Sequence, residues 1–482
     1  MKYLLRNCWR FDFSLCRFFI AVTTIVIFFV VAGCHSFGER HIKIRDEFIG
    51  GKVDKAKSDV NRAIKMSSRK DKDLLKLNSA IIELCSGRPK SAELLLREVR
   101  DNFDRIEQEK ATNAARNAAS LITDDNSLAY VGEDYEKVLI RVFLAISNLM
   151  YDGTDAYAYA MQINDKQNKI IESRKNEVAK LSNNNSNLQK QVEVNYRNVP
   201  IGAYLSGLLL EETKRNYDDA YKNYEKAGLW TSDKKFGNYQ ISKDLERVKN
   251  GLHSKSGNGV VYVFVLAGRG PYKEQRNCQV LHEAQILTTA ILSHVSDVSL
   301  IPDFAPIMIP VIVTPDANKL GYKLQSEIDV LVDNKFSGTA ERITNISNMA
   351  TAQFEANQPI IIARAIIRRA FKKGIIYGTK KATDANSWVG LALELGGMLW
   401  ESLETADTRC WNLLPDHIQV YRVELPVGEH EITLGQILKT GGTKNNGYSK
   451  KIHVHDGRNT YVLANFIDNK LIGEITVSNE NK

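Results

Sequence analysis

The amino-acid sequence predicts an α+β fold, in which a helical half precedes a half of mixed helices and strands. From about residue 38 to 250, apolar residues recur at the spacing of an amphipathic helix, and proline is scarce. From Gly259 onward, short runs with strand character alternate with glycine-containing turns. We therefore expect a helical domain over residues 38–250 and an α+β domain over residues 257–480.

The first residues have the three-part layout of an export signal. An apolar run over residues 18–33 is shorter than the roughly 20 residues that a membrane-spanning helix needs. Small residues lie directly before Cys34, and the segment 31–34 resembles the lipobox of bacterial lipoproteins, whose cysteine accepts lipid. The run follows a basic region that contains Lys2, Arg6, Arg10 and Arg17.

We therefore expect residues 1–33 to be a signal peptide that is cleaved before Cys34. Lipid on Cys34 would then anchor the chain to a membrane on its periplasmic side. His35 and Ser36 follow the cysteine in place of an aspartate, which favours the outer membrane over the inner one. The alternative is an uncleaved signal anchor in which Cys34 is incidental, and it also places the rest of the chain in the periplasm.

The helical half contains four turns, each followed by a helix with small alanines. Alanine allows two helices to cross at about 8–10 Å, where a larger side chain would push them apart. The pattern therefore predicts pairs of helices, with an irregular bundle that lacks a groove as the alternative. The four places are Gly51 with Ala56 and Ala63, Gly87 with Ala92, Gly153 with Ala156 and Ala160, and Asn216 with Ala220 and Ala227.

The segment after Asn216 resembles the second helix of a tetratricopeptide repeat (TPR), including its Tyr-x-x-Ala pairs. Gly51 and Gly87 lie 36 residues apart, close to the repeat length of about 34 in that family. The resemblance implies stacked helix pairs with a concave surface that takes up protein segments. The residues that we expect to contact such a partner are Tyr135, Tyr217, Tyr221 and Tyr224.

The C-terminal half is expected to form a small β-sandwich that carries helices. Asp456-Gly457 is a strong signal for a hairpin between the last two strands. Strands are predicted at residues 260–267, 306–315, 417–425, 429–435, 449–455 and 459–466, and helices near residues 339–356, 360–381 and 386–404.

The composition, with 43% hydrophobic and 25% charged residues, is that of an ordinary globular protein. The signal peptide contributes +3 to the net charge of +8, and the remaining +5 is too mild to indicate nucleic-acid binding. No CxxC pair or clustered Cys/His spacing occurs, so we expect neither a metal nor a cofactor. An oxidising periplasm would allow a disulfide between Cys278 and Cys410, which the sequence alone leaves open.

Several segments together resemble a family of uncharacterised bacterial lipoproteins, over residues 125 to 440 or so. They are YVGEDYEKVL at residues 130–139, GRGPYK at 268–273, ARAIIRRAFK at 363–372 and DTRCWNLLP at 407–415. Family members usually carry a Glu-x-Arg-Arg cluster where this chain has residues 161–164, MQIN, which puts the role of those charges in doubt here. The resemblance implies no known enzymatic activity.

Candidate binding groups are few. Arg269, Lys273 and Arg409 are candidates for an anion site or a structural site. The loop GRGP at residues 268–271 is expected to be either an anion-binding nest of backbone amides or a tight turn. Asp407 and Trp411 suit a structural ion pair with Arg409 and an aromatic plug at a domain junction. The basic stripe from Arg364 suits either anionic lipid headgroups or an acidic partner or, more commonly, a solvated face paired with acids of the helical half. His453 and His455 point either to a metal site or, more commonly, to an exposed strand.

The sequence favours a non-enzymatic scaffold that binds periplasmic or envelope proteins and is held at the membrane by its lipid. No catalytic triad or Cys-His pair stands in a recognisable local context, so no catalytic residue is expected. A ligand-binding or enzymatic module in the α+β half is the alternative. A third interpretation is a structural subunit of a ring complex, for which apolar residues 386–400 would form a contact.

Overall fold

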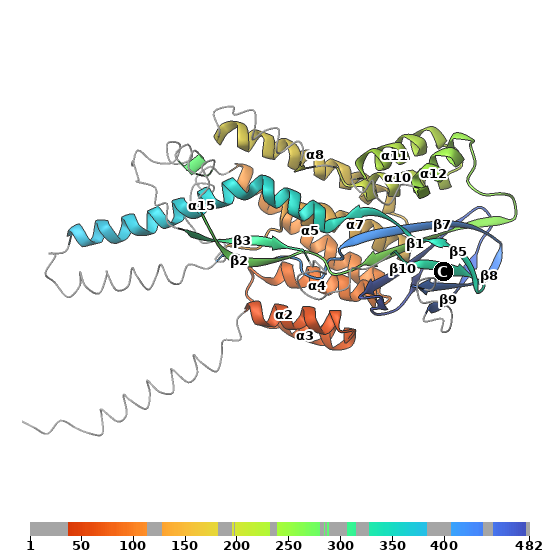
Figure 1. Ribbon diagram of the computed structural model, residues 1–482, viewed down its shortest axis with the longest axis horizontal. Helices are drawn as coiled ribbons and strands as arrows, with labels where there is room; N and C mark the ends of the chain where they lie inside the picture. Colours follow the sequence, from red (N-terminus) through yellow and green to blue (C-terminus); the bar gives the residue numbers. More distant parts are fainter. Residues whose placement is uncertain are drawn as a thin grey trace, which may run out of the picture.

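The computed structural model describes residues 37–112, 128–181, 195–196, 198–231, 239–279, 284, 287–288, 306–314, 327–382, 406–436 and 447–478. The signal peptide over residues 1–33, Cys34 and the helix expected at residues 386–404 lie outside the described residues. The described part combines helices and strands, as the sequence predicts (Figure 1).

Four antiparallel helix pairs form the N-terminal half. They are α2 (Phe37–Ile49) with α3 (Val53–Met66), α4 (Lys72–Cys85) with α5 (Pro89–Thr112), α7 (Asp134–Tyr151) with α8 (Ala156–Leu181), and α10 (Pro200–Glu212) with α11 (Tyr217–Trp230). Helix α12 (Tyr239–Lys249) follows. Each helix packs against the next described helix along the chain. The four expected turns join the pairs, and Gly51, Gly87 and Gly153 adopt positive φ there.

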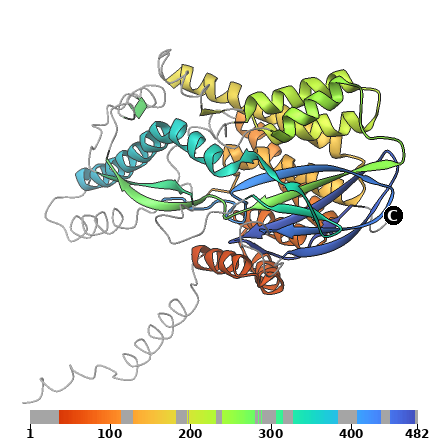
Figure 2. The same cartoon turned by 45° about the vertical axis from the view of Figure 1, so that its right-hand side comes forward.

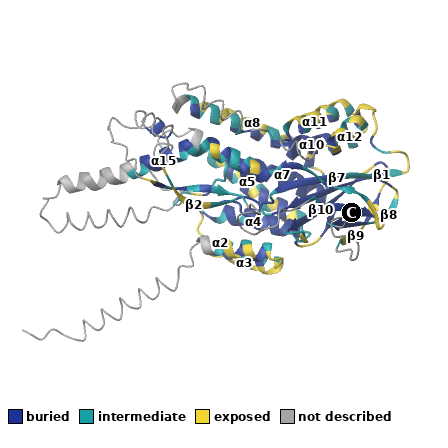
Figure 3. Cartoon of the chain, viewed as in Figure 1, coloured by how far each residue is buried: buried dark blue, intermediate teal, exposed yellow. Residues whose placement is uncertain are grey.

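Small alanines lie at the contacts between these helices, as predicted. Ala56, Ala92, Ala156, Ala160 and Ala220 are completely buried. The first helices of the later pairs are buried on nearly every side, because second helices cover one side and a β-sheet covers the other. The concave surface that the sequence suggested is therefore filled by the protein's own sheet (Figure 3).

The central sheet has the strand order β11-β10-β1-β7-β6, with β12 (Thr476–Val477) beside β10. Strand β1 lies parallel to β10 and antiparallel to β7. Its side chains alternate between two cores: Tyr262 and Phe264 face the helices, whereas Val263 and Val265 face a second sheet. The bounds are β1 (Asn258–Ala267), β6 (Glu341–Asn345), β7 (His417–Pro426), β10 (Asn459–Ile467) and β11 (Lys470–Leu471).

The second sheet has the order β5-β4-β8-β9 and packs on the face of β1 that points away from the helices. The result is a three-layer arrangement of helices, central sheet and second sheet, which contains the expected β-sandwich (Figures 1 and 2). Its strands are β4 (Asp329–Val332), β5 (Lys335–Thr339), β8 (Gly428–Gly435) and β9 (Tyr448–Val454).

Strands β2 (Tyr272–Cys278) and β3 (Ile307–Val313) form a separate antiparallel pair outside the central sheet. Helix α15 (Ile346–Ala382) lies beside this pair. Helix α15 packs on β3 through a small separate core that includes Ile309 and Ile366. In both views these elements project from the same end of the molecule (Figures 1 and 2).

Three details differ from the sequence prediction. Strands β5 and β6 occupy the start of the helix expected at residues 339–356, and α15 runs unbroken through Pro359 where two helices were expected. Asp456-Gly457 forms a turn but no hairpin, because β9 pairs with β8 while β10 pairs with β1. Every residue of β10 is buried, which suits an inner strand of the central sheet and not a hairpin edge. Cys278 and Cys410 are free thiols.

A close approach at Gly473 ties the central sheet to the helices. Gly473 has φ +81°, and a Cβ atom there would overlap the carbonyl oxygen of Cys85 at the end of α4. The same oxygen accepts a hydrogen bond of 2.9 Å from the amide of Glu474. The segment after β11 therefore caps α4 and leaves no room for a side chain at residue 473.

We expect Gly473→Ala to destabilise the fold far more than Gly153→Ala. Both residues have positive φ, which costs alanine about 1–2 kcal/mol. Nothing lies within 4 Å of an added Cβ at Gly153, whereas overpacking at Gly473 should add a further 1–3 kcal/mol or so. Urea unfolding of the two variants measures the difference, and equal losses would contradict the close approach.

Candidate functional site

Three of the segments that carry the lipoprotein resemblance meet at one buried place. Residues 130–139 span the start of α7, residues 268–273 connect β1 to β2, and residues 407–415 precede β7. Lys273 forms an ion pair with Glu133, and the amide of Trp411 donates to Glu136 at 2.7 Å. We call this the junction; its residues are Asp71, Tyr130, Glu133, Tyr135, Glu136, Lys273, Asp407, Arg409 and Trp411.

The carboxylate of Glu136 lies at the centre of the junction. It accepts hydrogen bonds from the hydroxyl groups of Tyr130 and Tyr135 and from the amides of Glu133 and Trp411. Glu136 is completely buried, and its contact with the Glu133 amide closes a capping box at the start of α7. Burial and the nearby Glu133 raise the pKa of Glu136.

The predicted cations Lys273 and Arg409 both have acidic partners within the junction. Burial alone would lower the pKa of Lys273, but Glu133 and Asp407 outweigh it and raise that pKa. Arg409 contacts Asp407 at 2.8 Å and Asp71 at 3.0 Å, and its guanidinium lies over the ring of Tyr130. The ion pair expected between Asp407 and Arg409 is thus confirmed.

Trp411 is the aromatic plug that the sequence suggested. It is completely buried and packs edge-on against Phe143 of α7, with ring centroids 5.5 Å apart. His41 connects α2 to the same segment, because its Nε2 donates to the carbonyl oxygen of Cys410 at 3.1 Å. Burial lowers the pKa of His41 to about 4, so the ring stays neutral near pH 7.

A small hollow adjoins the junction between α2 and the loop after β1. Its cavity volume is about 40 Å³, room for a few water molecules. Arg269 lines the hollow and pairs with Asp468, and Arg45 stacks on the ring of Tyr272, 4.9 Å from its centroid. Apolar side chains, among them Phe48 and Leu414, form the remaining wall.

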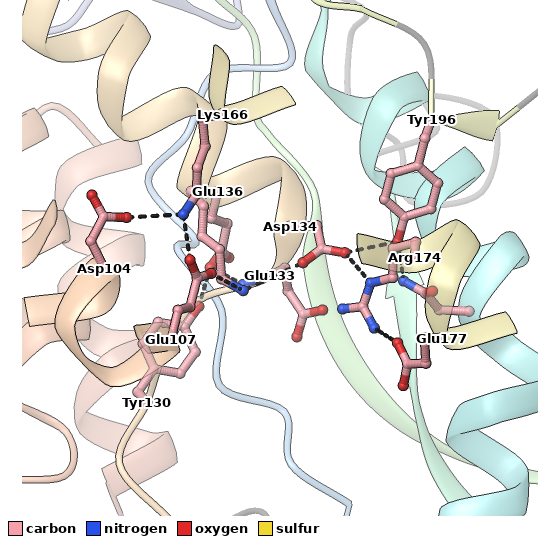
Figure 4. Close-up of polar contacts among 12 residues, drawn as sticks. Asp104, Glu107, Tyr130, Glu133, Asp134, Glu136, Lys166, Arg174, Glu177 and Tyr196 are labelled. Atoms are coloured by element: carbon pink, nitrogen blue, oxygen red, sulfur yellow. Dashed lines mark hydrogen bonds and ion pairs between the residues drawn. The ribbon is translucent and has the colours of Figure 1, made fainter. Parts of the chain in front are cut away.

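A second set of charges, buried or half-buried, links α5, α7 and α8 (Figure 4). Asp134 pairs with Arg174 at 2.7 Å and accepts a hydrogen bond of 2.9 Å from the hydroxyl of Tyr196. Lys166 contacts Asp104 at 2.9 Å and also reaches Glu107. Sequence reasoning missed this set. Its one local signal is the presence of charged residues on α7, an otherwise apolar helix.

The remaining predicted residues lie at different places. Tyr135 and Tyr224 are buried, so neither offers a surface to a partner, whereas Tyr217 and Tyr221 are half-buried on α11. Arg364 of the basic stripe pairs with Glu177 of α8 at 2.8 Å, as expected for acids of the helical half.

Two kinds of site have no support within the described residues. His453 and His455 lie with ring centroids 4.6 Å apart, but no group of three His, Cys, Asp or Glu side chains in the described part of the chain could hold a metal ion. No helix among residues 37–382 that the structure describes is long and apolar enough to cross a membrane.

Comparisons with protein-family models, curated proteins and solved structures find no match to this chain. The fold and the junction define a helical-hairpin array that is fastened to a mixed β-sheet by buried charges.

We expect Arg409→Met to cost about 3–5 kcal/mol of unfolding free energy, because it removes the direct ion pairs of Asp71 and Asp407 in a buried place. Arg276→Met is the matched control, since Arg276 and its partner Glu274 are both exposed and their pair should contribute about 1 kcal/mol or less. Chemical unfolding of both variants tests this. Similar small losses would show that the junction does not hold the layers together.

We expect the protein to lose stability as the pH falls from 6.5 towards 4. His41 has a depressed pKa of about 4 in the folded state, so protonation favours the unfolded chain across that range. The effect should reach about 3 kcal/mol. Burial also lowers the pKa of His253 and His417, so the informative comparison is with His41→Gln, which keeps those residues. Urea unfolding between pH 4 and 7 should show a weaker pH dependence in the variant. If the unfolding free energy of the variant fell with pH as steeply as that of the parent, His41 would be excluded as a source of the loss.

Proposed function

We propose that this protein is a membrane-anchored periplasmic lipoprotein that acts as a non-enzymatic, protein-binding scaffold in the cell envelope. The observation that carries the proposal is the ordered stacking of four helix pairs, each packed on the next. Such stacking is the organising feature of helical-repeat proteins, whose usual role is to bind other proteins. On this proposal the pairs are TPR-like units that have acquired a sheet on their inner side.

The surface that we assign to a partner is the outer face formed by α5 and α8. Arg97 of α5 contacts Asp155, which directly precedes α8. Asp104, further towards the C-terminal end of α5, contacts Lys166 within α8. Both helices therefore run in the same direction side by side, as second helices of successive repeats do. Large apolar side chains on this pair are exposed to solvent: Leu94, Tyr157 and Met161.

The inner side of the array supports this choice of surface. An open helical-repeat protein would present its first helices to a bound segment, but α7 and α10 are buried under the central sheet. A partner would therefore meet the second helices, and of the expected contact residues Tyr217 and Tyr221 on α11 remain partly accessible.

A second candidate function is ligand binding at the hollow beside the junction. Two guanidinium groups, those of Arg45 and Arg269, stand next to apolar walls, an arrangement suited to a small anion with an apolar part. The cavity of about 40 Å³ would have to widen to admit one, so the scaffold is the function that the geometry favours.

The test expresses the full chain with its own signal in a bacterium with two membranes. Partners are crosslinked and identified by affinity purification and mass spectrometry, with Cys34→Ser as the control for anchoring. We expect reproducible envelope proteins that are lost from the triple variant Leu94→Ser, Tyr157→Ser and Met161→Ser.

The matched control removes three exposed apolar side chains elsewhere, by Leu252→Ser, Phe336→Ser and Val427→Ser. This variant should keep the partners, because its substitutions leave the α5–α8 face intact. A clean monomer without partners would overturn the scaffold proposal, and loss of partners in both variants would overturn the assigned surface.

A further inference from the structure

The charge of the chain is distributed very unevenly. Of the 65 Lys and Arg and 57 Asp and Glu residues, residues 1–36 hold four and one, and residues 37–70 hold ten and five. The remaining 51 basic and 51 acidic residues cancel over residues 71–482. All of the net positive charge outside the N-terminal 36 residues therefore belongs to the α2–α3 hairpin and the turn after it.

The basic side chains of this hairpin face solvent. Along α3, Lys55, Arg62 and Lys65 are exposed at intervals that place them on one side of the helix. Lys52 before the helix and Arg69 after it are exposed as well. Among the described residues, Lys52, Lys65 and Arg69 form no ion pair. Lys55 pairs with Glu47 and Arg62 with Asp59, so the protein itself neutralises only part of this stripe of cations.

The acidic side chains of the hairpin do not cancel this stripe. Glu47 is buried and pairs with Lys55, and Asp59 is largely buried and pairs with Lys43. Asp46 and Asp54 are exposed and lie towards the Gly51 turn. The end of the hairpin away from that turn, where α2 begins and α3 ends, is its most cationic part, because residues 37–43 and 60–70 together hold six basic residues and one acid, Glu39.

Two large apolar side chains are exposed in that half of the hairpin, one in the middle of α2 and one at the end of α3. Ile42 is 49% exposed and Met66 is 69% exposed. The antiparallel pairing, marked by the Lys43–Asp59 contact of 2.6 Å, places the start of α2 beside the end of α3. Each stands next to an exposed lysine, Lys43 or Lys65, and exposed apolar groups beside basic side chains are features of a surface that lies on anionic lipid.

We propose that the α2–α3 hairpin docks on a membrane surface of anionic phospholipid, with its cations at the headgroups and Ile42 and Met66 in the interface. The inference deepens the proposed function, because Cys34, the expected lipid site, precedes α2 by three residues. A basic surface beside acyl chains supplies a second membrane contact and orients the body on the membrane.

Orientation is the consequence of this docking. The α2–α3 hairpin lies at one edge of the molecule, and α10–α12 lie at the opposite edge in both views (Figures 1 and 2). A membrane at the first edge would hold the later helix pairs away from the lipid. The same chain in solution would have no preferred orientation.

The test uses vesicle sedimentation with the chain from residue 34 carrying Cys34→Ser, which keeps every described residue and has no acyl chain. We expect it to bind vesicles that contain phosphatidylglycerol, to bind pure phosphatidylcholine vesicles much less, and to dissociate at high salt. The variant Arg62→Gln, Lys65→Gln and Arg69→Gln should partition about 100-fold more weakly, roughly fivefold for each basic residue removed.

The matched control is Lys222→Gln, Lys226→Gln and Lys249→Gln, which removes the same charge from exposed positions on α11 and α12. It should bind as the parent does, and both variants should keep the parent's unfolding free energy. Equal weakening of both variants, equal binding to uncharged vesicles, or no vesicle binding would each overturn the proposal. Because this chain has no lipid and no partner, none of these outcomes depends on the crosslinking result that tests the scaffold.

Discussion

The buried carboxylate of Glu136 is the constraint on which the arrangement of the layers depends. A carboxylate removed from water costs several kcal/mol or more unless hydrogen bonds replace its hydration. Here four donors do so, and they come from the start of α7, from the segment before it and from Trp411 ahead of β7. Trp411 is the donor that comes from the sheet's side, so a shift of the sheet against the helical array would remove its hydrogen bond from this buried carboxylate.

Another buried charge cluster, centred on Glu211, links the helices to the central sheet at the opposite end of their interface. Glu211 of α10 is completely buried and contacts Arg247 of α12 at 2.7 Å and Arg422 of β7 at 3.3 Å. The hydroxyl of Tyr224 donates to the same carboxylate at 2.7 Å. Between the two clusters, Tyr262 and Phe264 of β1 fill the space under the helices. Attachment at both ends explains why the inner side of the array is closed.

Local patterns in the sequence predicted most elements, and contacts between distant residues explain what they missed. The strands at 260–267 and 417–425 and the turns at Gly51 and Gly87 depend on nearest neighbours along the chain. The pairing of β10 with β1 joins residues about 200 apart, so the turn at 456–457 looked like a hairpin. The short strands β4, β5 and β6 form by pairing with neighbouring strands, which a local sequence pattern does not reveal. At the junction, Asp407 and Arg409 stand two residues apart and were expected to pair, whereas Lys273 finds Glu133 across 140 residues.

Closure of the inner side restricts how the proposed scaffold can work. To open a groove between the first helices and the sheet, the chain would have to separate Glu136 from Trp411 and Glu211 from Arg422, and each separation would remove one partner from a buried carboxylate. Binding by an induced opening is therefore costly compared with binding on a surface that already exists. The second helices offer such a surface, and the charge of α2–α3 lies apart from it at the end of the array nearest Cys34. A body of this kind suits a rigid spacer that presents one face to a partner and another to the membrane.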